Sequence, residues 1–205
     1  MIKFENTSVY GWEAAILGMR NPMNSWDKSD SIIDHIGLAE IGENDLKLMK
    51  QLIKAGNDHS KFMRMILVSV DIIAPLYWWK EFDTYKVGTV RNSCSTMHKI
   101  HSKEFTIDDF SHEHLDLAYK TTFELIISAL NRAREVYLET NDKKYWWQLI
   151  QLLPSSYNQR ATVLLNYAVL RNMYHSRKNH KLDEWSEGFC SWVESLPYSE
   201  LITEV

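Results

Sequence analysis

The stretch FMRMILVSVDII, at residues 62–73, carries β-branched and aliphatic side chains at both sets of alternating positions. This pattern predicts a β-strand that is covered on both faces of its sheet. Arg64 and Asp71 interrupt the apolar run, and each would need a partner if it were buried, because removing an isolated charge from water is costly. The segment is the best strand candidate in the chain.

Helical patterns lie on both sides of this strand. Before it, Asn44 is a favourable N-cap for a helix with an apolar stripe over residues 46–53, and Gly56 is placed to end that helix. After it, Pro75 suits the first turn of a short helix over residues 76–82. Further helices are expected over residues 9–20, 115–137, 143–153, 158–176 and 181–193, and a short strand over residues 1–6. A long strand amid so many helices favours an α+β fold.

Length and composition indicate one globular domain over residues 1–205. A chain of 205 residues with 45% hydrophobic and 24% charged side chains has the size and balance of a single folded domain. No internal repeat, low-complexity tract or linker-like segment marks a domain boundary.

The net charge and the length of the apolar runs exclude some classes of binding partner and some cellular locations. The formal net charge is −4, so the chain lacks the positive field that binding to polymeric nucleic acid normally requires. No apolar run approaches the roughly 18 residues of a membrane span, and neither terminus resembles a targeting signal. We therefore expect a cytoplasmic protein that binds neither membranes nor polymeric nucleic acid.

The histidines and cysteines do not form a standard metal or disulfide pattern. His112 and His114 are two residues apart, and His175 and His180 are five apart, so neither pair has the one-face helical spacing of a zinc hydrolase. Two cysteines cannot supply a disulfide framework or a four-thiolate zinc site. Gly-rich phosphate loops and the G-x-S-x-G elbow are also absent from the sequence. No bound metal is expected.

A polar and aromatic segment after the strand is the strongest candidate site. It runs from Trp78 to His98, WWKEFDTYKVGTVRNSCSTMH, and combines two tryptophans with cations, hydroxyl groups and a cysteine. Loops that follow strands often carry binding residues. Lys86 and Arg91, with the small residue Gly88 between them, would let cationic heads and backbone amides reach a phosphate. A plain surface loop is the competing interpretation.

The order of several motifs resembles that of the flavin-dependent thymidylate synthases. The motifs are D-H-S-K-F at residues 58–62, the long strand, A-P at residues 74–75, an aromatic helix, L-P-S-S-Y at residues 153–157, and N-x5-N-x4-R at Asn166, Asn172 and Arg177. The resemblance covers most of residues 44–190. It implies a central, mostly antiparallel sheet flanked by long helices, and a homotetramer with its sites at subunit interfaces.

The family signature, R-H-R-x-x-S-x-N-E-x-S-x-R, aligns with TYKVGTVRNSCST at residues 84–96, and no defined position is identical. Lys86, Thr89 and Cys94 are chemically related replacements for an arginine and two serines. Thr96 stands where the signature ends in arginine, and Arg91 is a cation five residues earlier. The resemblance therefore retains the flavin side of the site better than the nucleotide side, and an altered substrate is compatible with it.

The resemblance also implies roles for individual residues. Flavin contacts would come from His59, Ser60, Tyr85, Lys86, Asn166 and Asn172. Nucleotide contacts would come from Glu81, Arg91, Ser95 and Arg177, with Cys94 and Arg177 at the reacting end. Cys94 would act as a nucleophile or, in the alternative interpretation, would be a small residue packed in the loop.

The activity that the resemblance implies is a flavin-dependent transfer of a one-carbon unit, methyl or hydroxymethyl, to a pyrimidine deoxynucleotide. FAD would be the cofactor, with NADPH and methylenetetrahydrofolate as candidate co-substrates. The protein would contribute positioning and electrostatic stabilisation. The alternative is a non-catalytic, nucleotide-binding relative that acts as a regulatory or assembly subunit, because a shared fold does not by itself confer activity.

Overall fold

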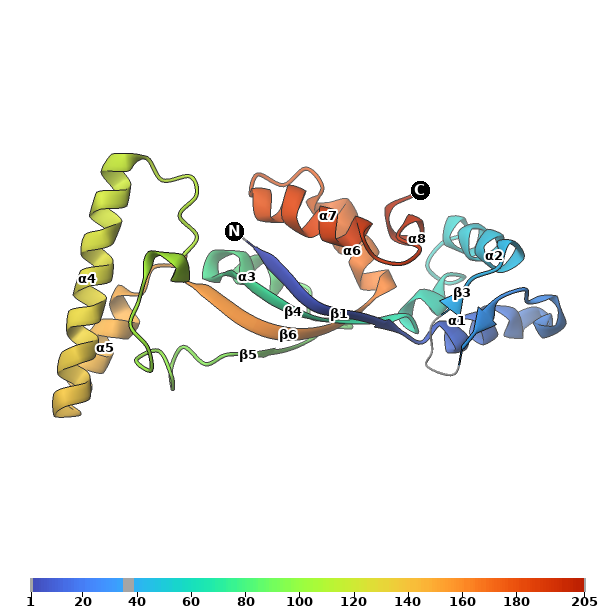
Figure 1. Cartoon of the computed structure of the whole chain (residues 1–205). Helices are drawn as coiled ribbons and strands as arrows, with labels where there is room; N and C mark the ends of the chain where they lie inside the picture. The colour runs from blue at the N-terminus through green and yellow to red at the C-terminus, as the bar shows by residue number, and fades with distance from the viewer. Residues whose placement is uncertain (1, 35–38, 205) are drawn as a thin grey trace. The chain divides into compact units, whose positions relative to one another are not determined.

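The computed structural model describes residues 2–34 and 39–204 (Figure 1). In the labels used below, η1 to η4 are 3-10 helices and η5 is a π-helix. The elements, in chain order, are β1 (Lys3–Tyr10), α1 (Trp12–Arg20), η1 (Asn21–Met23), η2 (Trp26–Lys28), β2 (Ile32–Ile33), β3 (Ala39–Glu40), α2 (Glu43–Lys54), η3 (Lys61–Arg64), β4 (Leu67–Pro75), α3 (Leu76–Phe82), β5 (Val90–Ser93), η4 (Ile107–Asp109), α4 (Leu117–Thr140), α5 (Lys143–Leu152), β6 (Asn158–Asn166), α6 (Tyr167–Arg177), η5 (Glu184–Phe189), α7 (Cys190–Glu194) and α8 (Glu200–Thr203). Every helix in the described part of the chain is too short or too polar to cross a lipid bilayer.

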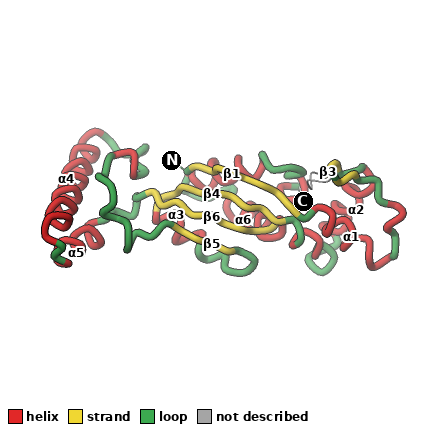
Figure 2. Tube along the Cα trace, turned by 60° about the horizontal axis from the view of Figure 1, so that its bottom comes forward, coloured by secondary structure: helices red, strands yellow, loops and turns green. Residues whose placement is uncertain are grey.

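Four strands form an antiparallel sheet in the order β1-β4-β6-β5, and Figure 2 shows them side by side. A second, two-stranded sheet pairs β2 with β3 in antiparallel register, Ile32 with Glu40 and Ile33 with Ala39. The expected α+β class with a central antiparallel sheet and flanking helices is thereby confirmed.

Strand β4 begins later than the strand predicted over residues 62–73. Residues 62–64 lie in η3, and β4 starts at Leu67. Buried and partly exposed side chains alternate along β4, so one face lies in the core and the other is only partly covered. On the partly covered face, the Asp71 carboxylate accepts hydrogen bonds from Asn6 Nδ2 at 2.9 Å and Thr162 Oγ1 at 2.5 Å, which are its partners across the sheet.

The chain folds into two compact units. The first comprises residues 1–3, 72–84 and 92–161, and the second comprises residues 4–71, 85–91 and 162–205. Strands β1, β4, β5 and β6 each contribute residues to both units. The single domain expected over residues 1–205 remains a prediction.

In the first unit, α4 and α5 lie side by side (Figure 1). Their apolar faces pack with the segment between β5 and α4 in one core cluster, composed of Ile100, Phe105, Phe110, Ile127, Leu130, Ala133 and Leu149. Helix α3 contributes a second aromatic group, in which Trp78, Trp79 and Phe82 are buried against one another. The indole nitrogen of Trp79 donates to the Gln159 carbonyl at 3.0 Å, so this buried polar group is satisfied.

In the second unit, aromatic side chains tie β1 and α1 to the C-terminal helices. Phe4 stacks on Trp192 with ring centroids 4.6 Å apart. Trp12 meets Tyr167 edge to face at 5.4 Å, and the Tyr167 hydroxyl donates to the Pro197 carbonyl. Burial raises the pKa of the Tyr167 phenol, so it remains a donor across the physiological range.

One predicted helix is wrong in its first half. The sequence pattern predicts a helix over residues 158–176, whereas residues 158–166 form β6 and α6 begins at Tyr167. Side chains on β6 are buried at every second position, which is the strand period, because Gln159, Ala161, Val163 and Leu165 all face the core. Asn166 then acts as the N-cap of α6, where its Oδ1 accepts from the Val169 amide at 3.0 Å.

The expected cap of α2 is also different. The helix begins at Glu43 after Gly42, so Asn44 lies inside it rather than at its N-cap. The Asp30 carboxylate accepts from the amides of Asn44 at 2.9 Å and Asp45 at 3.1 Å, so a distant residue satisfies the helix start. Gly56, with φ +105°, lies just beyond the C-cap as expected.

A buried ion pair orders the loop before α2. Arg20 Nε donates to Asp45 Oδ1 at 2.6 Å, and the two side chains are 5% and 0% exposed. Asp45 Oδ2 accepts from the Ser29 hydroxyl at 2.6 Å, the Ser31 hydroxyl at 2.7 Å and two backbone amides. Burial alone would raise the pKa of Asp45, but the hydrogen bonds from both serines and Arg20 outweigh it and hold the pKa below its ordinary value.

Candidate ligand site at the start of helix α6

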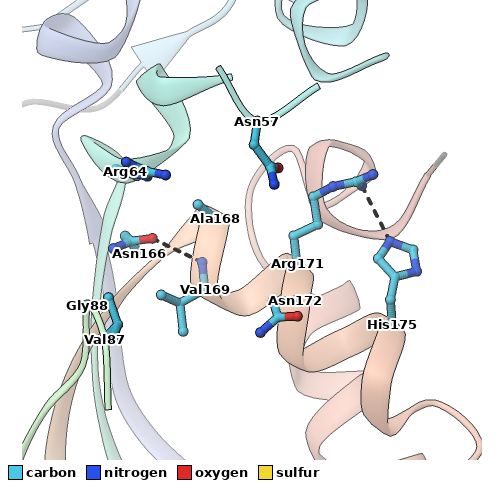
Figure 3. A pocket seen from close by; sticks show the side chains of 10 residues that line it. All are labelled: Asn57, Arg64, Val87, Gly88, Asn166, Ala168, Val169, Arg171, Asn172 and His175. Atoms are coloured by element: carbon cyan, nitrogen blue, oxygen red, sulfur yellow. Dashed lines mark hydrogen bonds between the residues drawn. The ribbon is translucent and has the colours of Figure 1, made fainter. Parts of the chain in front are cut away.

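A cavity of about 590 Å³, the α6 cavity, lies at the N-terminal end of α6 within the second unit (Figure 3). Its wall is drawn from the turn after α2, from η3, from the loop that follows α3, from the end of β6 and from α6 itself. The lining residues are Asn57, Arg64, Val87, Gly88, Asn166, Ala168, Val169, Arg171, Asn172 and His175. Segments that are distant in the sequence therefore meet at one helix start.

The wall of the cavity is positively charged and rich in amides. Arg64 and Arg171 are cationic, three asparagines offer both donors and acceptors, and none of the ten lining residues is acidic. The partial positive charge at the start of α6 adds to this field. Among the described residues, no carboxylate forms an ion pair with Arg64. This donor set suits an anionic ligand with a polar ring system.

Arg171 and His175 form the far wall of the cavity and lie one helical turn apart (Figure 3). Arg171 Nη1 is 3.4 Å from His175 Nε2, and it donates to the backbone oxygen of Glu204 at 3.1 Å. Burial, followed by the charges of Arg171 and Lys178, lowers the pKa of His175, although a hydrogen bond with the Ile202 backbone acts in the opposite direction. His175 is therefore neutral at neutral pH, and its Nε2 accepts from the guanidinium.

Gly88 lets the loop after α3 approach the helix start closely. Its φ is +77°, a left-handed conformation that favours glycine. A Cβ at this position would lie 3.0 Å from both Asn166 Nδ2 and Val169 Cγ2. The near wall of the cavity therefore depends on the absence of a side chain at residue 88.

Arg177, at the opposite end of α6, has a different environment. Its Nε donates to the Tyr85 hydroxyl at 2.8 Å. Its guanidinium carbon is 5.3 Å from the Tyr85 ring centroid and 5.0 Å from that of Trp185, distances typical of cation–π contacts. The structure thus brings together two residues singled out from the sequence, Tyr85 and Arg177, with Trp185 as a third member that the sequence did not indicate.

The other expected site residues of the second unit lie outside the set that lines the cavity. His59 and Ser60 belong to the turn after α2, where Ser60 Oγ donates to the Gly56 carbonyl at 3.2 Å. Lys86 is exposed and directly precedes the two loop residues of the cavity wall, and Arg91 lies on β5. Their proposed roles in binding remain predictions.

Three expected site residues belong to the first unit. Glu81 lies on α3, while Cys94 and Ser95 follow β5. Cys94 is exposed, and its backbone is fixed by hydrogen bonds from its amide to the Arg160 carbonyl at 2.9 Å and from Gln159 Nε2 to its carbonyl at 2.6 Å. The loop therefore presents this thiol to solvent from a fixed backbone.

The hydroxyl of Ser95 orders the turn that follows β5. Its Oγ accepts from the backbone amides of Met97 at 3.2 Å and His98 at 3.0 Å. These contacts give Ser95 a structural role in the turn. The expected roles of Glu81, Cys94 and Ser95 toward a nucleotide remain predictions.

Most residues that line the cavity are not among the site residues predicted from the sequence. Arg64 enters the sequence prediction only as an interruption of a strand, and Asn57 and Arg171 are not among the predicted site residues. A signal for part of the set is present, because four lining residues of α6 recur at positions i, i+3, i+4 and i+7 of one helical face: Ala168, Arg171, Asn172 and His175. The sequence indicates four of the cavity residues, since Asn166 and Asn172 are predicted flavin contacts and Val87 and Gly88 belong to the candidate segment from Trp78 to His98.

Neither cysteine lines this cavity, and His175 is the one histidine among its ten lining residues. Both cysteines are free thiols, Cys94 exposed and Cys190 buried in α7. Burial, together with the charge of Glu194, raises the pKa of Cys190 to about 11, so this thiol is unreactive at neutral pH. Within residues 2–34 and 39–204, no three His, Cys, Asp or Glu side chains are grouped as a set of metal ligands.

Comparisons with known proteins identify the fold and not the family. No protein-family model matches the chain, and no curated protein matches its sequence. Among solved structures, the chain is similar to the flavin-dependent thymidylate synthase ThyX of Helicobacter pylori complexed with FAD and dUMP, with a TM-score of 0.68 and 16% identity over 98% of this chain and 96% of that one. A second structure of that protein with FAD and dUMP gives the same TM-score and identity, over 98% and 95% of the two chains. At this identity, the likeness shows that the two proteins share a fold.

Proposed function

We propose that this chain is a divergent flavin-dependent thymidylate synthase, which binds FAD and transfers a one-carbon unit to a pyrimidine deoxynucleotide. The observation that carries the proposal is the cationic cavity at the start of α6. It occurs in a chain whose fold is similar to that of a thymidylate synthase solved with FAD and dUMP.

The residues of the cavity fit part of a flavin nucleotide. Its volume of about 590 Å³ lies in the range of roughly 300–1,000 Å³ that is common for small-molecule sites. Arg64, Arg171 and the partial positive charge at the start of α6 suit the two phosphate groups of FAD. Asn166 and Asn172 offer amide groups for the polar edges of a ring or ribose.

Bound FAD, in its reduced form, would supply a hydride. The chain itself would bind and orient the flavin through the α6 cavity and would hold an anionic nucleotide through Arg177 and Arg91. Lys86, which is exposed beside the cavity loop, would place a positive charge near the flavin. NADPH as reductant and methylenetetrahydrofolate as carbon donor belong to the same proposal, as do a homotetrameric assembly and a cytoplasmic location.

A second candidate is a non-catalytic relative that binds a nucleotide and acts as a regulatory or assembly subunit. The observation that favours it is the signature segment, in which residues 84–96 match none of the defined positions. The terminal arginine of the signature is replaced by uncharged Thr96, which removes one charge-assisted contact with a substrate.

The two candidates are separated by flavin binding and turnover, measured on the full chain. We expect the purified protein to carry a visible flavin absorption spectrum or to quench the fluorescence of added FAD in a saturable titration. With FAD bound, NADPH, methylenetetrahydrofolate and dUMP are then supplied and the methylated nucleotide is measured. Saturable FAD binding without formation of the methylated nucleotide supports the non-catalytic candidate. A protein that neither retains flavin on purification nor binds added FAD contradicts the first proposal.

The assembly is tested separately by native mass spectrometry. A mass of four chains with retained flavin agrees with the proposed homotetramer. A monomer that retains flavin contradicts the assembly and leaves the cofactor proposal intact.

A further inference from the structure

The environment of Arg177 is more constrained than that of an ordinary surface arginine. Arg177 is the last residue of α6, and its Nε donates to the Tyr85 hydroxyl at 2.8 Å. The same guanidinium contacts two aromatic rings, with its central carbon 5.3 Å from the centroid of Tyr85 and 5.0 Å from that of Trp185. Three contacts from two residues therefore act on one cationic group.

Trp185 is a rigid part of this arrangement. It is fully buried in the π-helix η5 and meets Phe189 edge to face at 5.1 Å. The His180 ring lies near the same indole, with centroids 6.4 Å apart. Short π-helical turns often occur at functional sites. A packed indole of this kind cannot follow the arginine if the arginine moves.

Tyr85 comes from a different part of the chain, the loop that also carries Val87 and Gly88 of the α6 cavity. Its ring centroid is 6.4 Å from that of Trp185. Tyr85 occupies the position of the histidine in the signature aligned with residues 84–96, so a comparison of motifs alone would count it as a loss. Its hydroxyl instead provides an acceptor for the arginine.

We propose that Tyr85 and Trp185 are positioning residues that hold the Arg177 guanidinium in one orientation for an anionic group of the nucleotide substrate. The guanidinium of arginine is planar, so stacking on two rings and the hydrogen bond to Tyr85 restrict the orientation of its plane. A guanidinium that is already ordered loses less entropy when it binds an anion. The inference rests on the proposed function, because it assigns Arg177 to the nucleotide.

The first test observes Arg177 itself and needs no ligand. Nitrogen-15 NMR of the full chain resolves arginine Nε–H groups, and the Arg177 signal is identified by its absence from the Arg177→Lys variant. We expect Tyr85→Phe, which removes only the hydroxyl, to increase the exchange rate of this proton with water about tenfold, since a hydrogen bond is lost.

The second test measures affinity for dUMP by calorimetry with FAD at saturation. We expect Tyr85→Phe and Trp185→Phe each to weaken dUMP binding about tenfold, because one charge-assisted contact becomes less well oriented. Trp185→Phe should change FAD affinity by less than about twofold. Near-ultraviolet circular dichroism identifies any variant that has lost its fold. If Trp185→Phe fails to fold, Tyr85→Phe alone decides the result.

Tyr174→Phe is the matched control. Tyr174 also lies on α6, and its hydroxyl donates to Glu194 Oε1 at 2.7 Å, so the same atoms are removed from a hydrogen bond elsewhere on the helix. We expect it to leave both readouts unchanged. The proposal is overturned if Tyr85→Phe leaves the Arg177 proton and the dUMP affinity as they are in the unmodified chain. If the unmodified chain binds neither FAD nor dUMP, the proposed function fails, and an unchanged NMR signal in Tyr85→Phe overturns the positioning role independently.

Discussion

Two regions of the second unit use positive charge in opposite ways. At the loop before α2, Arg20 lies inside the protein against Asp45, whose oxygens are saturated by serine hydroxyls and backbone amides. At the start of α6, Arg64 and Arg171 line a cavity whose wall has no acidic residue. An arginine that is paired with a carboxylate of the same chain stabilises the fold. Arginines in a wall without acidic residues instead create a positive potential that favours an anionic ligand.

The largest effect is expected from removing the buried carboxylate. Asp45→Ala leaves Arg20 buried without its counter-ion and deprives two serines of their acceptor, so the free energy of unfolding should fall by about 3–5 kcal/mol. Urea denaturation of the full chain measures it. The control is Glu135→Gln, which breaks an exposed pair with Arg132, 3.5 Å apart, and should change stability by less than about 1 kcal/mol. Equal effects of the two variants would contradict the structural role of Asp45.

Substitutions of the cavity arginines should reduce ligand affinity and not stability. Arg64→Gln and Arg171→Gln should each weaken FAD binding about 10- to 100-fold, because each removes a charge-assisted contact. Arg64 is exposed, so its substitution should change the free energy of unfolding by no more than about 0.5 kcal/mol. Fluorescence titration with FAD and urea denaturation measure the two quantities. Arg132→Gln, a change at an exposed arginine of the first unit, is the control, and a comparable loss of FAD affinity there would remove the case for a specific site.

A smaller effect is expected at the near wall of the cavity. Gly88→Ala places a methyl group 3.0 Å from Asn166 Nδ2 and Val169 Cγ2 at a backbone φ of +77°. The unfolding free energy should fall by about 1–2 kcal/mol, and FAD affinity should fall with it, because the loop must move away from α6. Gly56→Ala is the matched control, since Gly56 also has a positive φ but its Cβ would have no neighbour within 4 Å. If both substitutions have the same effect on FAD affinity, the close approach at Gly88 does not shape the cavity.

The smallest effect concerns pH. The folded pKa of Asp45 is lowered, so as the pH falls the unfolded chain binds the proton first. The contribution of Asp45 is therefore complete above the ordinary carboxyl pKa of about 4 and is lost as the pH falls through the folded pKa, with a slope of at most about 1.4 kcal/mol per pH unit. Unfolding free energies measured below about pH 5 should show a shallower slope in Asp45→Asn. An identical slope in both proteins would assign the acid sensitivity to other groups.

Much of the helical structure could be predicted because its signals are local. Pro75 and the aromatic run after it locate α3 at Leu76–Phe82, and the amphipathic pattern within residues 115–137 locates most of α4. The prediction failed at residues 158–166, where Leu164 and Leu165 are compatible with either a helix or a strand. Pairing with β4 and β5 decides in favour of a strand, and no local pattern reveals those partners.

The sequence by itself determined the α+β class and most helix positions, and it indicated Asn166 and Asn172 as candidate site residues. Only the tertiary structure decided which charges are neutralised. Asp45 meets Arg20 across 25 residues of chain, while Arg64 and Gly88 join α6 from segments far away in the sequence. The physical reason is that helix periodicity and capping act over a few residues, whereas burial and charge pairing depend on contacts between distant segments.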